Sequence, residues 1–475
     1  MSFNSLTFVC LFCFVVVIQY SRLPWNAKKS TLLICSYLFY AAWNPPFVLL
    51  LWLSTLVDWF MARLIAASSR PRVRKLGLIT SLAVNLGLLG FFKYSGFALE
   101  SFCDGMRLLG VVFRPLELDI ILPVGISFYT FQTLSYTLDI YRGSARPHRS
   151  FLDFALYVTF FPQLVAGPIV RSSHFLPQCA TPRDLDSSKF GWGLNLILIG
   201  LFEKIILADG LCAPVVEKAY GVDTIDFTGA WTGTLAFAGQ IFFDFNGYSL
   251  VAIGIAMCLG FAIPDNFRFP YAAIGFSDFW RRWHVSLSSW LRDYLYISLG
   301  GNRSGRARTY VNLMMTMLLG GLWHGASWSF VVWGALHGAF LGVERALMTT
   351  SLRSWHVWQT HIGRMALALL TFALVCFTWV FFRAESLSHA ISMTITMLGL
   401  GGDGGTSVFD FWTPLVVAIL TGLLILGHTI CREWGSLEAT VARIGPTTWG
   451  GVCLAMILLL VVCRGDERAF IYFQF

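Results

Sequence analysis

The chain has 475 residues, of which 56% are hydrophobic and 13% are charged, and its formal net charge is +8. A soluble globular protein carries roughly 25% charged residues, so this chain has too little polar surface for a water-facing body of its size. Many apolar runs are long enough to cross a hydrocarbon core of roughly 30 Å, which predicts an all-α, polytopic membrane protein. The basic residues lie in short loops between these runs, as orientation signals do, so we expect no nucleic-acid partner.

Several apolar runs are broken or are too long for one span. Pro45–Pro46 interrupts run 31–67 and predicts a tight turn between two helices. Runs 227–263 and 310–343 each either hold two spans or continue into a re-entrant piece. Run 151–170 is broken by proline and glycine, and we expect it to enter and leave on one face. In total we expect about 10–12 spans, with re-entrant and interfacial helices in addition. The apolar runs lie at 3–21, 31–67, 76–97, 118–138, 151–170, 190–212, 227–263, 310–343, 365–382, 411–430 and 447–463.

The positive charges give an orientation for the first helices. The first apolar run has no basic residue before it and no small-residue cleavage site, so we expect a retained helix rather than a signal peptide. Arg22, Lys28 and Lys29 follow this run and place its N-terminus outside. The basic segments 63–75 and 141–149 are both expected on the cytoplasmic face.

Segment 264–309 contains seven arginines against three aspartates and is also expected to face the cytoplasm. No soluble domain or repeat is visible, so we treat 1–475 as one membrane domain that includes this segment. Within it, 276–297 is predicted to form one amphipathic helix at the cytoplasmic interface. His284 lies within the apolar arc of that helix, where the pattern fits a hydrogen-bonded interfacial histidine and a functional one equally well. The apolar face consists of Phe276, Trp280, Trp283, Leu287, Leu291 and Tyr294.

A histidine stands inside an uncharged stretch near residue 320. Residues 310 to 343 include no Asp, Glu, Lys or Arg, and the only histidines among them are His324 and His337. An unpaired buried charge is costly, so we expect the imidazole of His324 to be neutral and hydrogen-bonded. A neutral imidazole is suited to accept a proton from a hydroxyl near pH 7. The pattern leaves His324 open between this role and a tie between two helices, whereas His337 is expected to be structural.

Other polar residues in apolar runs give weaker signals. Asp244 and Asn246 lie in an otherwise uncharged run, and an intramembrane aspartate is either a functional group or the partner of an arginine elsewhere. Gln163 is expected to stabilise an irregular backbone. The sequence contains no HExxH motif, no GxGxxG motif and no P-loop, so neither a metal site nor a nucleotide site is predicted.

Six motifs together resemble one family, the membrane-bound O-acyltransferases, and in particular the branch of bacterial alginate O-acetylation proteins. The longest runs from "NFRFPYAAIGFSDFWRRWHVS" into "LSSWLRDYLYISLGGNR" (266–303). The others are "SFYTFQTLSYTLDIYRG" (127–143), "FFPQLVAGPIVR" (160–171), "FFDFNGYSLVAIGIAMCLGF" (242–261), "GGLWHGASWSFVVWGALHG" (320–338) and "FIYFQF" (470–475).

The resemblance implies roles for the two histidines. His324 matches the catalytic histidine of the family, which lines a tunnel through the membrane. His284 matches the second motif histidine, on the cytoplasmic side. Asn246 stands where relatives often have serine or alanine, so no catalytic role is expected for it.

The resemblance also implies the reaction and its partners. An acetyl group would pass from acetyl-CoA or another acetyl thioester, used as a substrate with no bound cofactor and no metal, to a hydroxyl. Arginines of 264–309 would hold the phosphates of the donor. The resemblance also implies a location in the bacterial inner membrane. The expected partners are a periplasmic acetyltransferase and a polysaccharide synthase and export complex of the alginate or cellulose type. A transporter or flippase without its own chemistry is the alternative. Candidate donor- or substrate-binding residues are Arg281, Arg282, Trp283, Asp244, Asn246 and Trp323.

Overall fold

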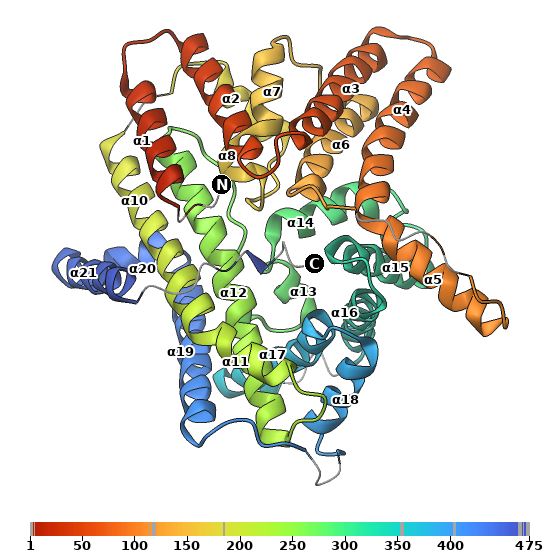
Figure 1. Cartoon of the computed structure of the whole chain (residues 1–475), viewed down its shortest axis with the longest axis vertical. Coiled ribbons are helices and arrows are strands. Elements are labelled where there is room, and N and C mark those ends of the chain that lie inside the picture. Colours follow the sequence, from red (N-terminus) through yellow and green to blue (C-terminus); the bar gives the residue numbers. More distant parts are fainter. Residues whose placement is uncertain are drawn as a thin grey trace. The chain divides into compact units, whose positions relative to one another are not determined.

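Figure 1 shows the computed structural model of the chain. Within the part that it describes, the secondary structure is α-, π- and 3₁₀-helical, without a β-strand, and one isolated β-bridge joins Ile225 and Thr406. The all-α prediction is confirmed. The described residues are 3, 5–113, 115, 120–183, 186–351, 356–401, 405–463, 468, 470 and 471.

Six helical stretches are long and apolar enough to cross a membrane, so the chain is a polytopic membrane protein. A seventh is possible if α20 (Leu437–Ile444) and α21 (Pro446–Val462), which are bent by 111°, count as one span. Fewer helices are long enough to span a membrane than the 10–12 predicted from the apolar runs. For example, α1 and α6 have only 15 and 17 residues, whereas a straight span needs about 20. The six stretches are α3 (Phe47–Ala67), α4 to α5 (Pro71–Leu108), α12 (Phe227–Cys258), α16 (Trp328–Leu347), α17 (His361–Arg383) and α19 (Trp412–Trp434).

The chain divides into two compact units, and the first comprises Met1–Ile197 and Val251–Pro264. The predicted turn at Pro45–Pro46 is confirmed, because α2 ends at Ala41 and α3 begins at Phe47. Run 151–170 is broken as predicted, with the short helices α7 and α8 followed by irregular buried backbone. The further helices of this unit are α1 (Leu6–Tyr20), α2 (Trp25–Ala41), α4 (Pro71–Leu89), η1 (Gly90–Tyr94), α5 (Ser95–Leu108), α6 (Ile126–Arg142), α7 (Phe151–Thr159), α8 (Phe161–Leu164), α9 (Ser172–Cys179) and most of α10 (Ser187–Phe202).

A buried polar cluster joins α3, α4 and α6 in the first unit. Asp58 is fully buried on α3 and accepts hydrogen bonds from Thr137 Oγ1 and Asn85 Nδ2, both over 2.6 Å, and from the Ser81 hydroxyl. Neutral donors from two neighbouring helices therefore satisfy this carboxylate, as interhelical polar contacts in membranes do. The sequence analysis did not single out Asp58.

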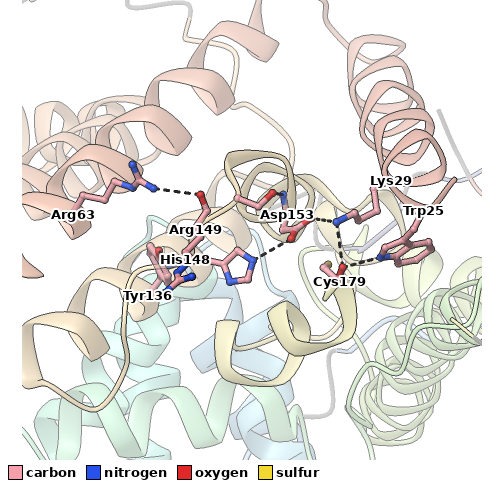
Figure 2. A network of polar contacts seen from close by, with 9 residues as sticks. Trp25, Lys29, Arg63, Tyr136, His148, Arg149, Asp153 and Cys179 are labelled. Atoms are coloured by element: carbon pink, nitrogen blue, oxygen red, sulfur yellow. Dashed lines mark hydrogen bonds and ion pairs between the residues drawn. The ribbon is translucent and has the colours of Figure 1, made fainter. Parts of the chain in front are cut away.

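Figure 2 shows a second buried network in this unit, around an ion pair between Lys29 of α2 and Asp153 of α7. Lys29 Nζ also donates to the carbonyl oxygen of Cys179 over 3.2 Å, and His148 Nε2 lies 3.1 Å from Asp153 Oδ2. Lys29 is only 4% exposed. The basic residues were expected to lie in loops, but Lys29 lies in α2 and its charge is neutralised inside the helix packing. The orientation of the first helix stays a prediction.

The second unit comprises Leu198–Leu250 and Asp265–Phe475. Run 227–263 contains one continuous helix, α12, whereas run 310–343 contains two, α15 (Arg306–His324) and α16. The expectation that 1–475 form a single domain stays a prediction. The further helices of this unit are η2 (Glu203–Cys212), α11 (Ala213–Tyr220), η3 (Pro270–Ala272), α13 (Phe276–Trp280), α14 (Val285–Trp290), η4 (Leu291–Tyr296), η6 (His356–Gln359) and α18 (Leu387–Met397).

Glycines allow α15 and α16 to pack closely against each other (Figure 1). A Cβ atom on Gly321 would overlap the carbonyl oxygen of Phe330, and one on Gly334 would overlap that of Met317. The two backbones therefore touch where side chains would otherwise keep helices apart. This close approach fixes the end of α15, where His324 lies.

Candidate active site

His324 is the last residue of α15. The helix ends there because Gly325 adopts an extended conformation, with φ −155° and ψ 148°. The side chain is 3% exposed, and its ring centroid lies 4.9 Å from that of Trp323 and 5.0 Å from that of Trp333. Phe382 of α17 lies 5.3 Å away on a third element. The imidazole is therefore held among aromatic rings at the end of α15, where the chain turns toward α16.

His284 interrupts the segment that was predicted to be one amphipathic helix. The prediction of a continuous helix over 276–297 was wrong, because α13 ends at Trp280 and α14 begins only at Val285. His284 has φ 43° and ψ 55°, a left-handed conformation that non-glycine residues rarely adopt. The backbone N–H of Val285 donates to the carbonyl oxygen of Asn266 over 2.9 Å, which holds the segment in this shape. Strained backbone of this kind clusters at functional sites.

Asn266 fixes the protonation of His284. The Oδ1 atom of Asn266 lies 2.9 Å from His284 Nδ1, and the Ser286 hydroxyl donates to the same oxygen over 2.8 Å. An amide oxygen only accepts, so Nδ1 carries the proton and Nε2 is the basic nitrogen of the ring. Asn266 Nδ2 lies 3.2 Å from Ser249 Oγ, which is consistent with this orientation of the amide. Burial lowers the pKa of His284 to about 3, so its imidazole is neutral at ordinary pH.

The two motif histidines lie together in the second unit. Their ring centroids are 6.4 Å apart, and the ring centroid of Trp323, the residue before His324, lies 5.9 Å from that of His284. The ring centroid of Phe245 of α12 lies 4.7 Å from that of His284. Two imidazoles in one aromatic enclosure are suited to proton transfer from a hydroxyl and to orientation of the reacting groups. Their catalytic assignment stays a prediction.

Asp244 pairs with a lysine rather than with an arginine. Its Oδ1 atom lies 2.9 Å from Lys204 Nζ, and its Oδ2 accepts from the backbone N–H of Ile471 over 2.9 Å. Lys204 lies equally close, at 3.0 Å, to Asp209 Oδ1. Lys204 was not among the expected site residues, because it lies within run 190–212, which was interpreted as apolar.

Asn246 also has a partner within the protein, because its Nδ2 donates to Glu203 Oε2 over 2.8 Å.

The other candidate donor-binding residues differ in accessibility. Arg281 is exposed, whereas Arg282 donates from Nε to Asp278 Oδ1 over 2.9 Å. Trp283 is completely buried, with Trp379 and Phe267 as ring neighbours at 5.0 and 4.9 Å, so it is part of the aromatic core. Of Arg281 and Arg282, Arg281 is therefore the one that can contact a ligand without breaking an ion pair.

His337 has a structural environment. Its Nε2 atom lies 3.0 Å from Thr378 Oγ1 of α17, and its ring centroid lies 4.6 Å from that of Trp333. His337 lies on α16, and its contact with Thr378 of α17 fits the expected structural role.

Gln163 donates from Nε2 to the carbonyl oxygen of Tyr157 over 2.8 Å, which also fits the expected backbone role.

Within the described ranges, no group of three or more His, Cys, Asp or Glu side chains is placed to hold a metal ion. Of the C-terminal motif 470–475, only Phe470 and Ile471 are among the described residues. Phe470 packs against Tyr248 and Phe245, with ring centroids 4.7 and 5.6 Å apart. The start of this motif therefore lies next to the aromatic wall of His284.

Comparison with known proteins is consistent with this arrangement. Residues 144–384 match the membrane-bound O-acyltransferase family. A probable alginate O-acetylase of Pseudomonas aeruginosa is 40% identical over 437 residues, which are 92% of this chain and 81% of the relative. A peptidoglycan O-acetyltransferase of Helicobacter pylori is 38% identical, covering 84% of this chain and 80% of the relative. A teichoic acid D-alanyltransferase of Bacillus subtilis is 24% identical, covering 56% and 70%.

The match covers most of both chains and includes the segments that carry His284 and His324. The chain belongs to the membrane-bound O-acyltransferase family, in the branch of the bacterial alginate O-acetylases, and is a multi-pass membrane O-acyltransferase.

Proposed function

We propose that this enzyme transfers acetyl groups from a cytoplasmic thioester to a hydroxyl group destined for an exported polysaccharide. The observation that carries the proposal is the pairing of His324 and His284, with ring centroids 6.4 Å apart inside an aromatic enclosure. The choice of an acetyl group and of a polysaccharide follows the names of two similar proteins, a probable alginate O-acetylase and a peptidoglycan O-acetyltransferase.

In the proposed mechanism His324 is the general base. A ring nitrogen of the neutral imidazole accepts the hydroxyl proton as the hydroxyl oxygen attacks the acetyl carbonyl carbon. The new C–O bond forms, the C–S bond breaks, and the proton passes from His324 to the leaving thiolate. General-base help of this kind contributes roughly 10²–10⁴-fold, and positioning of the reactants supplies much of the rest.

His284 has a different part in this mechanism. Because Nδ1 donates to Asn266, the nitrogen of His284 that can face a substrate is Nε2, which acts as an acceptor. It can therefore hold the attacking hydroxyl or an amide N–H of the donor, but it does not donate to the developing oxyanion. The left-handed backbone at His284 sets the direction of this nitrogen.

The donor in this proposal is acetyl-CoA or an acetylated carrier that reaches the site from the cytoplasm. Seven arginines in segment 264–309 favour a phosphate-bearing donor at this face. Of the neighbours Arg281 and Arg282, Arg281 is the candidate for a charge-assisted contact, because it is exposed and Arg282 is paired with Asp278. The acceptor lies beyond the bilayer. We therefore propose an inner-membrane location and a periplasmic acetyltransferase that works with a polysaccharide synthase and export complex.

His324→Ala and His324→Gln test this proposal in cells. Both variants should insert normally, because the ring is enclosed by aromatic side chains that remain, yet they should abolish acetylation of the exported polymer. The matched control is His337→Gln, which changes a buried histidine bonded to Thr378 and should leave acetylation per inserted protein largely intact. Near-normal acetylation with His324→Gln would refute the base assignment.

A further inference from the structure

The second unit contains a polar cavity of about 140 Å³. A single water needs roughly 10–15 Å³ of such space, so the cavity is large enough for a ligand group. Its polar wall comes from η2, α11, α12, the end of α17 and the C-terminal segment. The residues used below are Asp209, Glu217, Gln240, Asp244, Arg383 and Arg468.

Most charges of this wall are already paired. Lys204 lies 3.0 Å from Asp209 and 2.9 Å from Asp244, and Arg468 forms an ion pair with Glu217. Lys204, Arg383 and Arg468 carry three positive charges, which equal the three negative charges of Asp209, Glu217 and Asp244. An anion or a cation would disturb this balance, whereas a neutral polar ligand would not.

Two side chains of the wall are left for a ligand. Among the described residues, neither Arg383 nor Gln240 has a side-chain hydrogen bond or ion-pair partner, and Gln240 Oε1 is buried from solvent. Stacking orients the guanidinium of Arg383, which lies 5.3 Å from the ring centroid of Tyr220. An amide oxygen that is buried without a partner costs free energy, which a bound hydroxyl would recover.

The mixture of groups fits hydroxyls best. A hydroxyl both donates and accepts, whereas a carboxylate only accepts and a guanidinium only donates. A sugar ring presents adjacent hydroxyls, which can donate to Asp244 or Gln240 Oε1 and accept from Arg383. Unlike a phosphate or a carboxylate, a sugar hydroxyl uses both halves of this wall without adding charge.

The cavity shares its helices with the histidine pair. On α12, Phe245 follows Asp244 directly and contacts the ring of His284 at 4.7 Å. On α17, Phe382 precedes Arg383 directly and contacts the ring of His324 at 5.3 Å. A ligand in the cavity therefore lies against the same two helices that wall the histidines.

We propose that this cavity is the subsite for a sugar ring of the acceptor, held through its hydroxyls by Arg383 and Gln240. The inference rests on the proposed function, because an O-acyl acceptor must supply a hydroxyl. It adds the substrate class and two specificity residues to that function.

The test is a binding titration with the purified full-length protein in detergent. The probes are a cello-oligosaccharide and an alginate oligosaccharide, which share ring hydroxyls but differ in charge, and inorganic phosphate. The wild type should bind the neutral cello-oligosaccharide more tightly than the anionic alginate oligosaccharide, and Arg383→Gln and Gln240→Met should each weaken this binding roughly tenfold or more. The matched control is Arg443→Gln, whose guanidinium also lies over an aromatic ring, that of Trp434 at 5.0 Å, and which should bind like the wild type.

Three results would overturn the subsite: the cello-oligosaccharide does not bind more tightly than the alginate oligosaccharide, both variants bind it like the wild type, or phosphate displaces it. Folding of each variant is checked by gel filtration and by Tm. If Arg383→Gln does not elute as folded protein, Arg383→Lys replaces it, because lysine keeps the charge but lacks the planar guanidinium group. His324→Gln should bind sugar normally while failing to transfer acetyl. If His324→Gln transfers acetyl normally, the proposed mechanism fails while the subsite stands. If the Arg383 variants bind sugar like the wild type, the subsite fails while the proposed mechanism stands.

Discussion

Asn266 holds His284 by accepting a hydrogen bond from the Nδ1 atom of the histidine over 2.9 Å. Asn266→Ala removes this acceptor and also the acceptor of the Ser286 hydroxyl. We expect turnover to fall at least about tenfold, because the ring loses its fixed tautomer, together with a loss of about 1–3 kcal/mol in the free energy of unfolding. Steady-state kinetics and thermal unfolding in detergent measure the two effects.

The control for that variant is Asn312→Ala. Asn312 is also a buried asparagine, and its Nδ2 donates to the carbonyl oxygen of Gly301 over 2.9 Å, far along α15 from His324. It should cost similar stability while turnover per folded molecule is kept. An equal loss of turnover in both variants would contradict a positioning role for Asn266.

The lowered pKa of His284 predicts how stability depends on pH. The unfolded chain takes up a proton on this residue below about pH 6.5, whereas the folded protein does so only near its pKa of about 3. The free energy of unfolding should therefore fall as pH drops from about 6.5 toward 3. His284→Gln removes this contribution, so its Tm should fall less steeply over that window. Parallel curves for the two proteins would show that His284 is not buried in the neutral form.

The contact between α15 and α16 predicts that one methyl group can disable the site. Gly321→Ala places a Cβ against the carbonyl oxygen of Phe330, which belongs to the backbone and cannot turn away. We expect lower Tm and strongly reduced acetyl transfer, although no reacting group is removed. Gly342→Ala on α16 is the control, because its Cβ would meet only the Tyr310 ring at 3.5 Å. Equal behaviour of the two variants would contradict the packing argument.

Lys204 and Asp244 predict a non-additive pair of substitutions. Lys204→Met leaves Asp244 and Asp209 buried without their shared cation, which should cost about 3–5 kcal/mol. The double variant Lys204→Met with Asp244→Asn removes one of the stranded charges and should recover part of that loss. A double-mutant cycle of unfolding measurements gives the coupling. Simple additivity would mean that the ion pair contributes nothing.

Much of the site could be predicted from the sequence. His324 stands out because it is an ionisable group in an uncharged run, and the surrounding motifs indicate both it and His284. Asp244 was correctly singled out as requiring either a function or a partner. Its partner was missed because Lys204 is a single charge inside an apolar run, and pairing of this kind depends on which helices pack together.

The local conformation at the site was not predictable in the same way. The spacing of apolar residues over 276–297 fits one helix, and five of the six residues of its predicted apolar face are indeed buried, with Trp280 partly exposed. The helix is broken at His284 because contacts with Asn266, which precedes it in the chain, hold a left-handed backbone there. Similarly, Lys29 resembled a loop charge, and only the packing of α2 against α7 brings it to Asp153.

The most direct test is a transfer assay with purified full-length protein, a labelled acetyl thioester and a sugar acceptor, comparing the wild type with His324→Gln. With His324 as the proton acceptor, the variant should remain folded and bind both substrates, while the rate of acetyl transfer falls by roughly 10²–10⁴-fold. Transfer by His324→Gln at a rate close to that of the wild type would contradict the account.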